Sequence, residues 1–351
     1  MLYLFFYIIL AFCSLIRKKS KIVCVLLVGL LFIMTIFSQY GNDINNIREM
    51  FDYTIFTKDA LERSPFFCAI VLFFSELGIS FTQFRILQFL IWALAFFFFL
   101  KRFSLYPTLV VTCCFFFPIV GFGAQFRNGI MVGLLYFALY FLFSLERKKG
   151  ILVYMILLGI ASLIHTIALI YLSLLLAFVP CSRLKLTKIC VICCVAMTII
   201  VNTSILFGFV LNNFGDWNSQ YFSSMESMNL TIFILLVGIV ANLKLSCRYS
   251  DVIASNKRNY NKFQLELAEL TPRINLVMMA LIPLLFFSLS FYRIFQNLFI
   301  LSSVLAINTY RINRTCRDGD MVIYLVVYAM ITIFYNRWQG EFLPYLNGIH
   351  I

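Results

Sequence analysis

Few side chains of this 351-residue chain could take part in acid–base chemistry, because only 12% of its residues are charged and only two are histidines. His165 stands in the apolar segment IASLIHTIALI, and an imidazole can accept a proton near neutral pH. Asp43, in YGNDINNI, places a carboxylate just after a long apolar run. We expect one of these two side chains to act as a general base. A buried structural histidine and a helix-capping aspartate are the alternative interpretations.

Two arginines interrupt apolar sequence, where a charge usually faces a cavity or a partner. Arg127, in GFGAQFRNGI, follows Gln125 and lies among glycines, which let a backbone approach a ligand closely. Arg293, in SLSFYRIFQNL, divides one long apolar stretch. These positions predict a site for an anionic ligand. An interfacial arginine and a simple turn between two spans are the respective alternatives.

Two aromatic residues of the polar stretch 212–229, Trp217 and Tyr221, could form a platform for sugar faces. The alternative is an aromatic belt at the membrane surface. The eleven cysteines do not indicate a metal or disulfide site, because CVICC at 190–194 lies within an apolar run and no histidine pair is near. We therefore predict no metal. We also predict no cofactor, because the glycine patterns of nucleotide-binding sites are absent.

The elements that would hold these residues are apolar helices. Of all residues 62% are hydrophobic, and they form uninterrupted runs of about 15 to 23 residues without the alternation of barrel strands. A hydrocarbon core about 30 Å thick needs about 20 helical residues, and fewer where the bilayer thins. The predicted fold is all-α: a polytopic integral membrane protein with about 12 transmembrane helices plus one interfacial or re-entrant helix.

The predicted spans cover most of a single transmembrane domain, residues 1–351. They lie near 2–16, 22–38, 86–100, 103–120, 129–145, 151–163, 166–180, 189–211, 230–246, 274–291, 294–310 and 321–335. The first run lacks the basic start and the cleavage pattern of a signal peptide, so we expect it to be a span.

The formal net charge of +13 does not indicate nucleic acid, because the basic residues form short clusters between apolar runs. That pattern follows from the positive-inside rule, so we assign the clusters to the cytoplasm. In this topology 39–64 and 212–229 are external loops, and 247–273 is a cytoplasmic loop. The external side then receives the candidate residues, and three external arginines lie close to or between spans: Arg85, Arg127 and Arg293.

The short run 65–79 has to be the interfacial or re-entrant helix in this topology, since a full crossing would reverse everything after it. The alternative topology makes 65–79 a span and 151–179 one long kinked helix. It would place the basic residues 101, 102 and 147–149 outside the cytoplasm, against the positive-inside rule. Its 29-residue helix would measure about 43 Å, which is long for one crossing.

Three short elements follow one another along the chain: Tyr-Gly-x-Asp-like at Tyr40–Asp43, Arg-x-Gly-Ile-like at Arg127–Ile130 and Ile-His-Thr-x-Ala-Leu-like at Ile164–Leu169. Their order resembles the EpsG family of Wzy-type polysaccharide polymerases, over roughly residues 25–310. One departure is that the family tends to carry aromatic residues just after the aspartate, where this chain has Ile44 and Ile47.

The resemblance implies a membrane glycosyltransferase that polymerises oligosaccharide repeat units carried on undecaprenyl pyrophosphate. The product would be O-antigen, capsule or exopolysaccharide, and the enzyme would work at the outer face of the bacterial inner (cytoplasmic) membrane. Its partners would be the lipid-linked oligosaccharide, membrane lipid and a chain-length regulator protein, with no nucleic acid.

The resemblance also implies roles for the candidate residues. Arg127 and Arg293, with Gln125, would bind the pyrophosphate, because guanidinium forks suit phosphate oxygens and neutralise the charge of the leaving group. His165 or Asp43 would accept the proton of the attacking sugar hydroxyl.

Three other functions use similar chemistry. A lipid-linked oligosaccharide flippase would also bind pyrophosphate with basic residues, but in a cavity that both faces can reach. A membrane acyltransferase could use His165 and would draw its acyl group from the cytoplasm. A polysaccharide ligase is chemically almost identical to a polymerase, and the sequence pattern does not separate these two.

Overall fold

A computed structural model of the chain describes residues 2–37, 42–53, 65–202, 230–286 and 291–309. Throughout these ranges the regular structure is helical and no strand occurs, so the all-α prediction is confirmed for this part of the chain. The loop 212–229 with Trp217 and Tyr221, and the predicted span 321–335, lie outside these ranges. So do residues 39–41 and 54–64 of the predicted loop 39–64.

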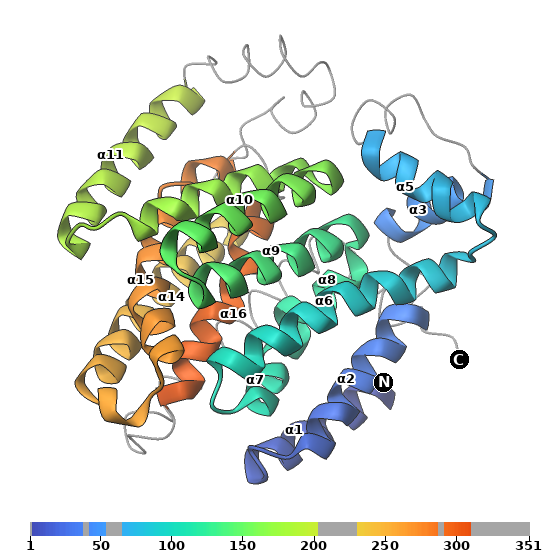
Figure 1. The fold of residues 1–351 in the computed structure, drawn as a ribbon, viewed down its shortest axis with the longest axis horizontal. Helices are drawn as coiled ribbons and strands as arrows, with labels where there is room; N and C mark the ends of the chain where they lie inside the picture. The colour runs from blue at the N-terminus through green and yellow to red at the C-terminus, as the bar shows by residue number, and fades with distance from the viewer. Residues whose placement is uncertain (1, 38–41, 54–64, 203–229, 287–290, 310–351) are drawn as a thin grey trace. The chain divides into compact units, whose positions relative to one another are not determined.

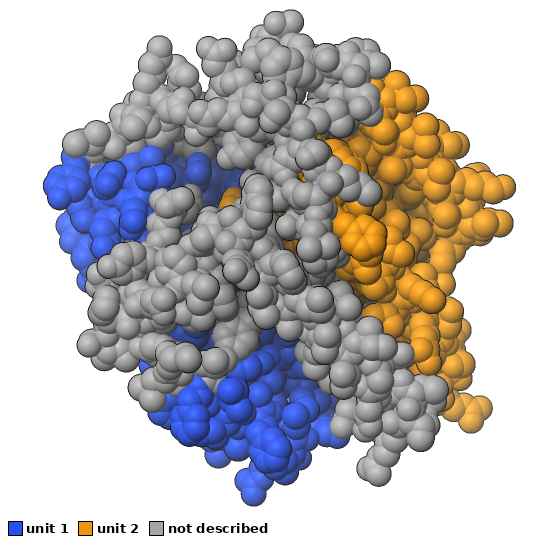
Figure 2. Space-filling model, turned by 180° about the vertical axis from the view of Figure 1, so that it is seen from behind, with its two compact units in different colours: residues 1–169, 306–351 blue, residues 170–305 orange. Residues whose placement is uncertain are grey.

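The chain divides into two compact units, coloured separately in Figure 2. The first unit is Met1–Leu169 with Ala306–Ile351, and the second unit is Ile170–Leu305. Two described helices, α6 (Phe81–Phe103) and α9 (Phe126–Ser144), are long and apolar enough to cross a membrane by length and composition alone. The count of about 12 spans stays a prediction.

The described part of the first unit consists of helices (Figure 1). Besides α6 and α9 its described elements are α1 (Leu2–Ile16), α2 (Lys21–Phe37), α3 (Asn42–Tyr53), α5 (Pro65–Glu76), α7 (Pro107–Cys114), η1 (Phe115–Ile119), α8 (Val120–Ala124) and α10 (Arg147–Ile164). The second unit holds α11 (Arg183–Asn202), α14 (Leu230–Ser255), η4 (Lys257–Asn259), α15 (Lys262–Met279) and η5 (Ile282–Phe286). Two helices contribute residues to both units: η2 (Thr166–Phe178) and α16 (Tyr292–Thr309).

Helices α6 and α9 lie side by side and run in the same direction. The ring centroids of Phe84 and Phe126 are 5.0 Å apart near their starts, and those of Phe103 and Phe143 are 5.6 Å apart near their ends. Helix α10 follows α9 after a short turn and packs along it, so it runs back and ends where α9 begins. We call the end at which α6 and α9 begin the site end of the unit.

The opposite end carries the basic clusters of the first unit, and we call it the basic end. Thr108 Oγ1 donates a hydrogen bond to the carbonyl of Ser20 at 3.2 Å, and Lys19 Nζ lies 5.5 Å from the ring centroid of Tyr106. The α1–α2 turn therefore lies beside the start of α7. Three clusters share this end: residues 17–21, 101–102 and 147–149.

The α6–α7 turn at the basic end is fixed by Asn308, the penultimate residue of α16. Its Oδ1 accepts a hydrogen bond from Leu105 N at 2.7 Å, and its Nδ2 donates to the carbonyl of Phe103 at 2.8 Å. One amide side chain thus satisfies both the last turn of α6 and the turn that follows.

The predicted span 103–120 is a helix of three parts, α7, η1 and α8. The middle part, η1, is π-helical and contains Pro118. A proline removes a backbone donor, and single π turns often mark functional regions. The helix then stops at Gln125, whose φ of −100° and ψ of 88° are not helical.

Two helices, α6 and α15, begin earlier in the sequence than the apolar runs predicted, and each begins with a polar cap. Helix α6 starts at 81 rather than 86, where Ser80 and Gln83 form a capping box. Helix α15 starts at 262 rather than 274, where Asn261 and Gln264 form another. The polar stretch 247–273 is consequently helical over most of its length, within α14, η4 and α15.

Helix α5 lies at the site end along its whole length. The ring of Phe67, near its start, is 6.1 Å from that of Phe126, and the ring of Phe74, near its end, is 5.3 Å from that of Phe84. Both partners belong to the first turns of α9 and α6. The amphipathic helix α3 packs against α5 and α6 there.

The chain changes its winding at His165. Helix α10 ends on this residue, which has an extended backbone (φ −149°, ψ 111°), and the 3₁₀ helix η2 follows over 13 residues. The chain thus breaks between the predicted segments 151–163 and 166–180, and the second segment is 3₁₀ rather than α-helical. That the two segments cross the membrane separately stays a prediction. Long 3₁₀ segments are uncommon.

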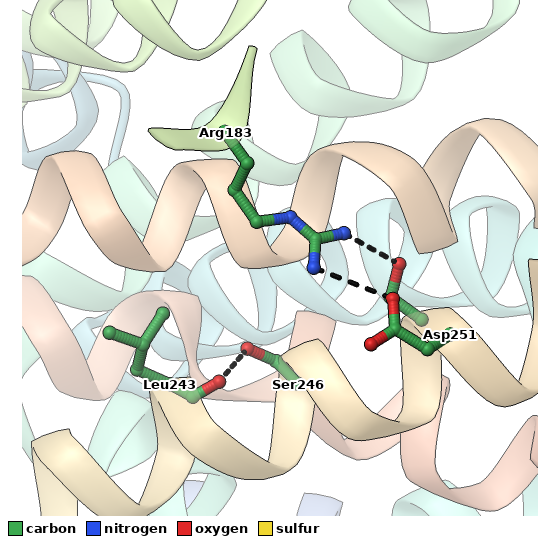
Figure 3. A network of polar contacts seen from close by, with 5 residues as sticks. Arg183, Leu243, Ser246 and Asp251 are labelled. Carbon is green, nitrogen blue, oxygen red and sulfur yellow. Dashed lines mark hydrogen bonds and ion pairs between the residues drawn. The ribbon is translucent and has the colours of Figure 1, made fainter. Parts of the chain in front are cut away.

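In the second unit, α14 and α11 both pack against α15. Figure 3 shows Arg183, at the start of α11, reaching toward α14. Its guanidinium donates to Asp251 Oδ1 and to Ser250 Oγ, both at 3.4 Å. The ion pair is partly exposed, so it contributes little stability, and it links the start of α11 to α14.

Arg273 of α15 ties down the far end of η2. Its guanidinium donates to the carbonyls of Ala177 at 2.5 Å, Val179 at 2.5 Å and Cys181 at 2.8 Å. The last carbonyls of a helix lack partners within the helix, and a guanidinium offers several donors in one plane. This side chain therefore caps η2.

Candidate functional site

Arg85, in the second turn of α6, is the largest fully buried side chain at the site end, with 1% of its surface exposed. Its guanidinium donates to the carbonyl of Thr35 at the end of α2 and to the carbonyl of Gly123 in α8, the latter at 3.3 Å. The buried charge thus joins three elements. It is placed where α8 leads into the break at Gln125.

Gln88, one helical turn after Arg85, is fully buried and bridges the same break. Its Nε2 donates to the carbonyls of Phe122 at 3.1 Å and Phe126 at 3.3 Å, on either side of Gln125. Its Oε1 is buried and accepts no hydrogen bond within the described part of the chain. The break is therefore held in shape by side chains of α6.

Two glycines of α9 allow the helix to approach its neighbours. A Cβ at Gly129 would come within 2.3 Å of the Phe122 carbonyl oxygen and 2.8 Å of Gln88 Nε2, and one at Gly133 within 3.0 Å of the Trp92 backbone. These glycines are four residues apart on one helix face, as in the small-xxx-small pattern of closely packed membrane helices. Any larger residue would push α9 away from α6 and α8.

Gln125 and Asn128 pair with each other at the start of α9. Asn128 Nδ2 donates to Gln125 Oε1 at 2.8 Å, and both side chains are buried. Helix α9 has no side-chain cap at Gln125. The backbone N–H groups of its first turn carry the positive end of the helix dipole.

Arg127 is the second residue of α9 and is half-buried. Its guanidinium carbon lies 5.9 Å from the ring centroid of Phe67 in α5, a cation–π contact. The predicted pair Gln125 and Arg127 is therefore found on one turn, beside the buried Arg85 and Gln88 cluster.

His165 lies at the site end, because α10 runs antiparallel to α9 and ends there. The side chain is half-buried, and its Nδ1 accepts a long contact of 3.5 Å from Ile167 N. Its carbonyl accepts from Ala168 N at 3.0 Å, which begins the 3₁₀ winding. The histidine thus occupies the junction of two helix types.

Asp43 is the second residue of α3, so it lies in the first turn rather than before the helix, as capping would require. Ile44, Ile47 and Phe51 are 0%, 2% and 3% exposed, and they form the buried face of α3. The two isoleucines therefore serve packing.

Arg293 belongs to the second unit, where it is the second residue of α16 and half-buried. Near it, Asn297 Nδ2 donates to Tyr171 Oη at 2.9 Å, and that hydroxyl donates to the carbonyl of Ile294 at 3.3 Å. Whether Arg293 shares one site with Arg127 stays a prediction.

Sequence reasoning placed Arg85 near the external face but assigned no role to it, to Gln88 or to Asn128. A signal existed for the first two, because they are three residues apart and share one face of an otherwise apolar helix. No comparable signal exists for Asn128, whose partner is fixed by the break at Gln125.

A comparison with models of protein families gives the family of the chain. The model of the EpsG family matches residues 21–347, nearly the whole chain. The chain belongs to the EpsG family. EpsG proteins are Wzy-like polymerases, so the chain is a membrane protein of polysaccharide biosynthesis.

The EpsG match includes all candidate residues, from Asp43 to Arg293. The Arg-x-Gly-Ile-like element of this EpsG protein is the first turn of α9, and its glycine is the residue that the Phe122 carbonyl approaches. The Ile-His-Thr-x-Ala-Leu-like element is the junction of α10 and η2. No curated protein and no solved structure matches the chain.

Proposed function

We propose that this EpsG protein polymerises oligosaccharide repeat units carried on undecaprenyl pyrophosphate, at the outer face of the bacterial inner membrane. A hydroxyl of one unit attacks the anomeric carbon of a second unit. The bond from that carbon to the pyrophosphate oxygen breaks, and the lipid pyrophosphate leaves with the bonding electrons. The hydroxyl proton passes to a base of the enzyme.

The observation that carries the proposal is the position of Arg127 in the first turn of the 19-residue helix α9. The guanidinium and the N–H groups of that turn together offer donors and positive charge. A pyrophosphate leaving group gains negative charge in the transition state, so donors already in place lower the barrier. Arg293 is assigned the same role from the second unit, and Gln125 a supporting one.

His165 and Asp43 remain the two candidates for the base. Both belong to elements that meet the site end of the first unit, α10 and α3. The contact of 3.5 Å from Ile167 N to His165 Nδ1 is too long to fix the tautomer of the imidazole. Trp217 and Tyr221 keep their proposed role as sugar contacts.

The proposed topology places the site end outside the cytoplasm. Two observations support it: the basic clusters share the opposite end, and both halves of α5 contact the first turns of α6 and α9. A helix of 12 residues measures about 18 Å and does not cross a bilayer. We therefore propose that α5 is the interfacial or re-entrant helix.

The proposal predicts that Arg127→Ala and Arg293→Ala leave the protein in the membrane but remove long glycan chains, so that single repeat units accumulate on the lipid carrier. Loss of one transition-state donor lowers the rate by about 10² to 10³. The measurement is the ladder of surface polysaccharide on a gel. Arg102→Ala, an exposed arginine at the basic end, is the control and should leave the ladder unchanged.

Normal ladders from both arginine variants would contradict the proposed site. Deletion of the gene then separates the remaining functions. Single-unit products indicate a polymerase, whereas complete loss of surface polysaccharide indicates a flippase or a ligase. Chains of unchanged length that lack acyl groups indicate an acyltransferase.

A further inference from the structure

A polar junction inside the second unit joins three helices. Asn275 of α15 lies at its centre, with 7% of its surface exposed. Its Nδ2 donates to Ser246 Oγ of α14 and to Ser302 Oγ of α16, both at 3.0 Å. Its Oδ1 accepts a hydrogen bond from Asn242 Nδ2 of α14 at 3.4 Å. We call these four residues the amide junction.

The hydrogen bonds of the amide junction have fixed directions. Figure 3 shows the Ser246 hydroxyl directed at the carbonyl of Leu243 in its own helix, to which it donates at 2.8 Å. The Ser246 oxygen therefore accepts from Asn275. Both N–H groups of the Asn275 amide are used in this way, and so is its oxygen. A polar network whose central group is satisfied favours one arrangement of its helices over others.

The amide junction determines which faces of the three helices meet. Apolar side chains contact lipid as favourably as they contact one another, so apolar contact alone does not select the facing sides of membrane helices. Directed hydrogen bonds between helices do select them. Asn242 and Ser246 are four residues apart on one face of α14, and Asn275 reaches both. The same amide also fixes the side of α16 that faces α15 at Ser302.

Helix α16 is held at two levels within the second unit. Ser302 is bound to Asn275, and five residues earlier Asn297 Nδ2 donates to Tyr171 Oη at 2.9 Å. At 3.6 residues per turn these two positions lie about 140° apart around the helix axis, so the two contacts together oppose a rotation of α16. Arg293 is the second residue of this helix and lies about 14 Å from Ser302 along the axis. A rotation would therefore change the direction in which the arginine points.

We propose that Asn275 is a positioning residue of the polymerase: through Ser302 it fixes the rotation of α16 and thereby the direction in which Arg293 meets the lipid pyrophosphate. The inference rests on the proposed function, which assigns the pyrophosphate to Arg293. A guanidinium that is turned aside keeps its charge but loses its directed hydrogen bonds to phosphate oxygens. A displacement of about 1 Å at a reacting group can lower a rate about 10²-fold.

The test measures the rate at which the purified full chain in detergent joins lipid-linked repeat units, extracted from cells that lack the gene. All variants are compared at a temperature where thermal unfolding shows them folded. Asn275→Leu removes the amide and nearly keeps the volume, and it should lower the rate about 10- to 100-fold. Ser302→Ala, which removes the bond to α16, should lower the rate as well.

Ser303→Ala is the matched control. Ser302 and Ser303 are neighbours on α16 and are both 2% exposed, but the Ser303 hydroxyl donates to the carbonyl of Phe299 in its own helix at 3.3 Å. This substitution removes the same group from the same helix without touching the amide junction. We expect the joining rate of Ser303→Ala to equal that of the intact chain.

Coupling to Arg293 separates positioning from a general structural effect. In an Arg293→Ala background, Asn275→Leu should lower the rate less than about twofold, because the residue that it positions is gone. An equal loss in both backgrounds would overturn the inference, as would a normal rate of Asn275→Leu. If Asn275→Leu does not fold, the same comparison with Ser302→Ala decides. An intact chain that joins no repeat units would contradict the proposed function itself, and the inference with it.

Discussion

Gly129 has a role that no side chain could replace. The Phe122 carbonyl and the Gln88 amide occupy the space that a Cβ would need, so the glycine sets how closely α9 approaches α8 and α6. The same turn carries Arg127, Gln125 and Asn128. A shift of α9 would therefore move the arginine that we assign to the pyrophosphate.

We expect Gly129→Ala to lower the stability of the protein by about 1 to 3 kcal/mol and to shorten the glycan product, because overpacking forces the backbone to move. Thermal unfolding in detergent and the polysaccharide ladder measure the two effects. Gly159→Ala is the matched control, since a Cβ at that position of α10 meets nothing within 4 Å. Equal effects of the two substitutions would show that the close approach is unimportant.

Arg85 is best understood as a positioning residue. It is buried, and its guanidinium donates to the carbonyls of Thr35 and Gly123. A buried charge in a membrane protein is costly and is usually retained for a function. Here the charge fixes α8, which ends at the break before Arg127.

A lysine at position 85 keeps the charge but lacks the planar fork, so it should not reach both carbonyls. We predict that Arg85→Lys weakens folding by about 1.5 to 3 kcal/mol, the contribution of a hydrogen bond to a charged group. We also predict that the variant makes fewer long glycan chains, measured on the polysaccharide ladder at a temperature where the variant is fully folded. The latter readout separates positioning from stability alone, and Arg102→Lys at the basic end should change neither quantity.

At the scale of the elements, the end of η2 depends on a residue distant in sequence. Arg273, about a hundred positions further along the chain, binds the carbonyl of Ala177 in the last turn of η2 and that of Val179 just after it. The α-helices α6 and α15, in contrast, start with their own capping boxes. The second unit therefore relies on one side chain for the end of this segment.

Replacing that side chain should loosen η2 without unfolding the first unit. We expect Arg273→Gln to lower the stability of the second unit by about 1.5 to 3 kcal/mol, since it removes charge-assisted bonds to three carbonyls. Hydrogen exchange should rise at residues 177–181. Arg258→Gln, an exposed arginine of η4 in the same unit, should leave the exchange unchanged. Unchanged exchange in Arg273→Gln would contradict the capping role.

At the scale of the molecule, the two ends of the first unit should face opposite sides of the membrane. We predict that a cysteine introduced at Leu77, exposed just after α5, reacts with an impermeant thiol reagent added outside the cell. Cysteines introduced at Lys18 or Lys148 should react only after the membrane is permeabilised. The background is a variant in which the eleven natural cysteines are replaced. Labelling of Lys148→Cys in intact cells would favour the alternative topology.

The sequence predicted most helices of the first unit, because apolar runs report which segments are buried in lipid or protein. It also predicted separate segments before and after His165, since a single apolar helix over 151–179 would be long for one crossing. It did not predict the early start of α15 or the winding of η2, because hydropathy is blind to caps and to hydrogen-bond pattern.

The site was predicted in part. Gln125 and Arg127 were found because they are polar residues among glycines, a local signal. The contacts of Gly129 with Phe122 and Gln88 depend on the register between helices, which no local pattern contains. The same holds for Arg85, whose partners come from α2 and α8.

The 3₁₀ winding of η2 affects how far the chain reaches. A 3₁₀ helix advances about 2.0 Å per residue and an α-helix about 1.5 Å, so its 13 residues extend about 26 Å, a length for which an α-helix needs about 17. Methods that count residues therefore underestimate this segment as a crossing of a hydrocarbon layer about 30 Å thick. With three residues per turn, its side chains also stand in three straight rows, so residues three apart share the same neighbours along the rod.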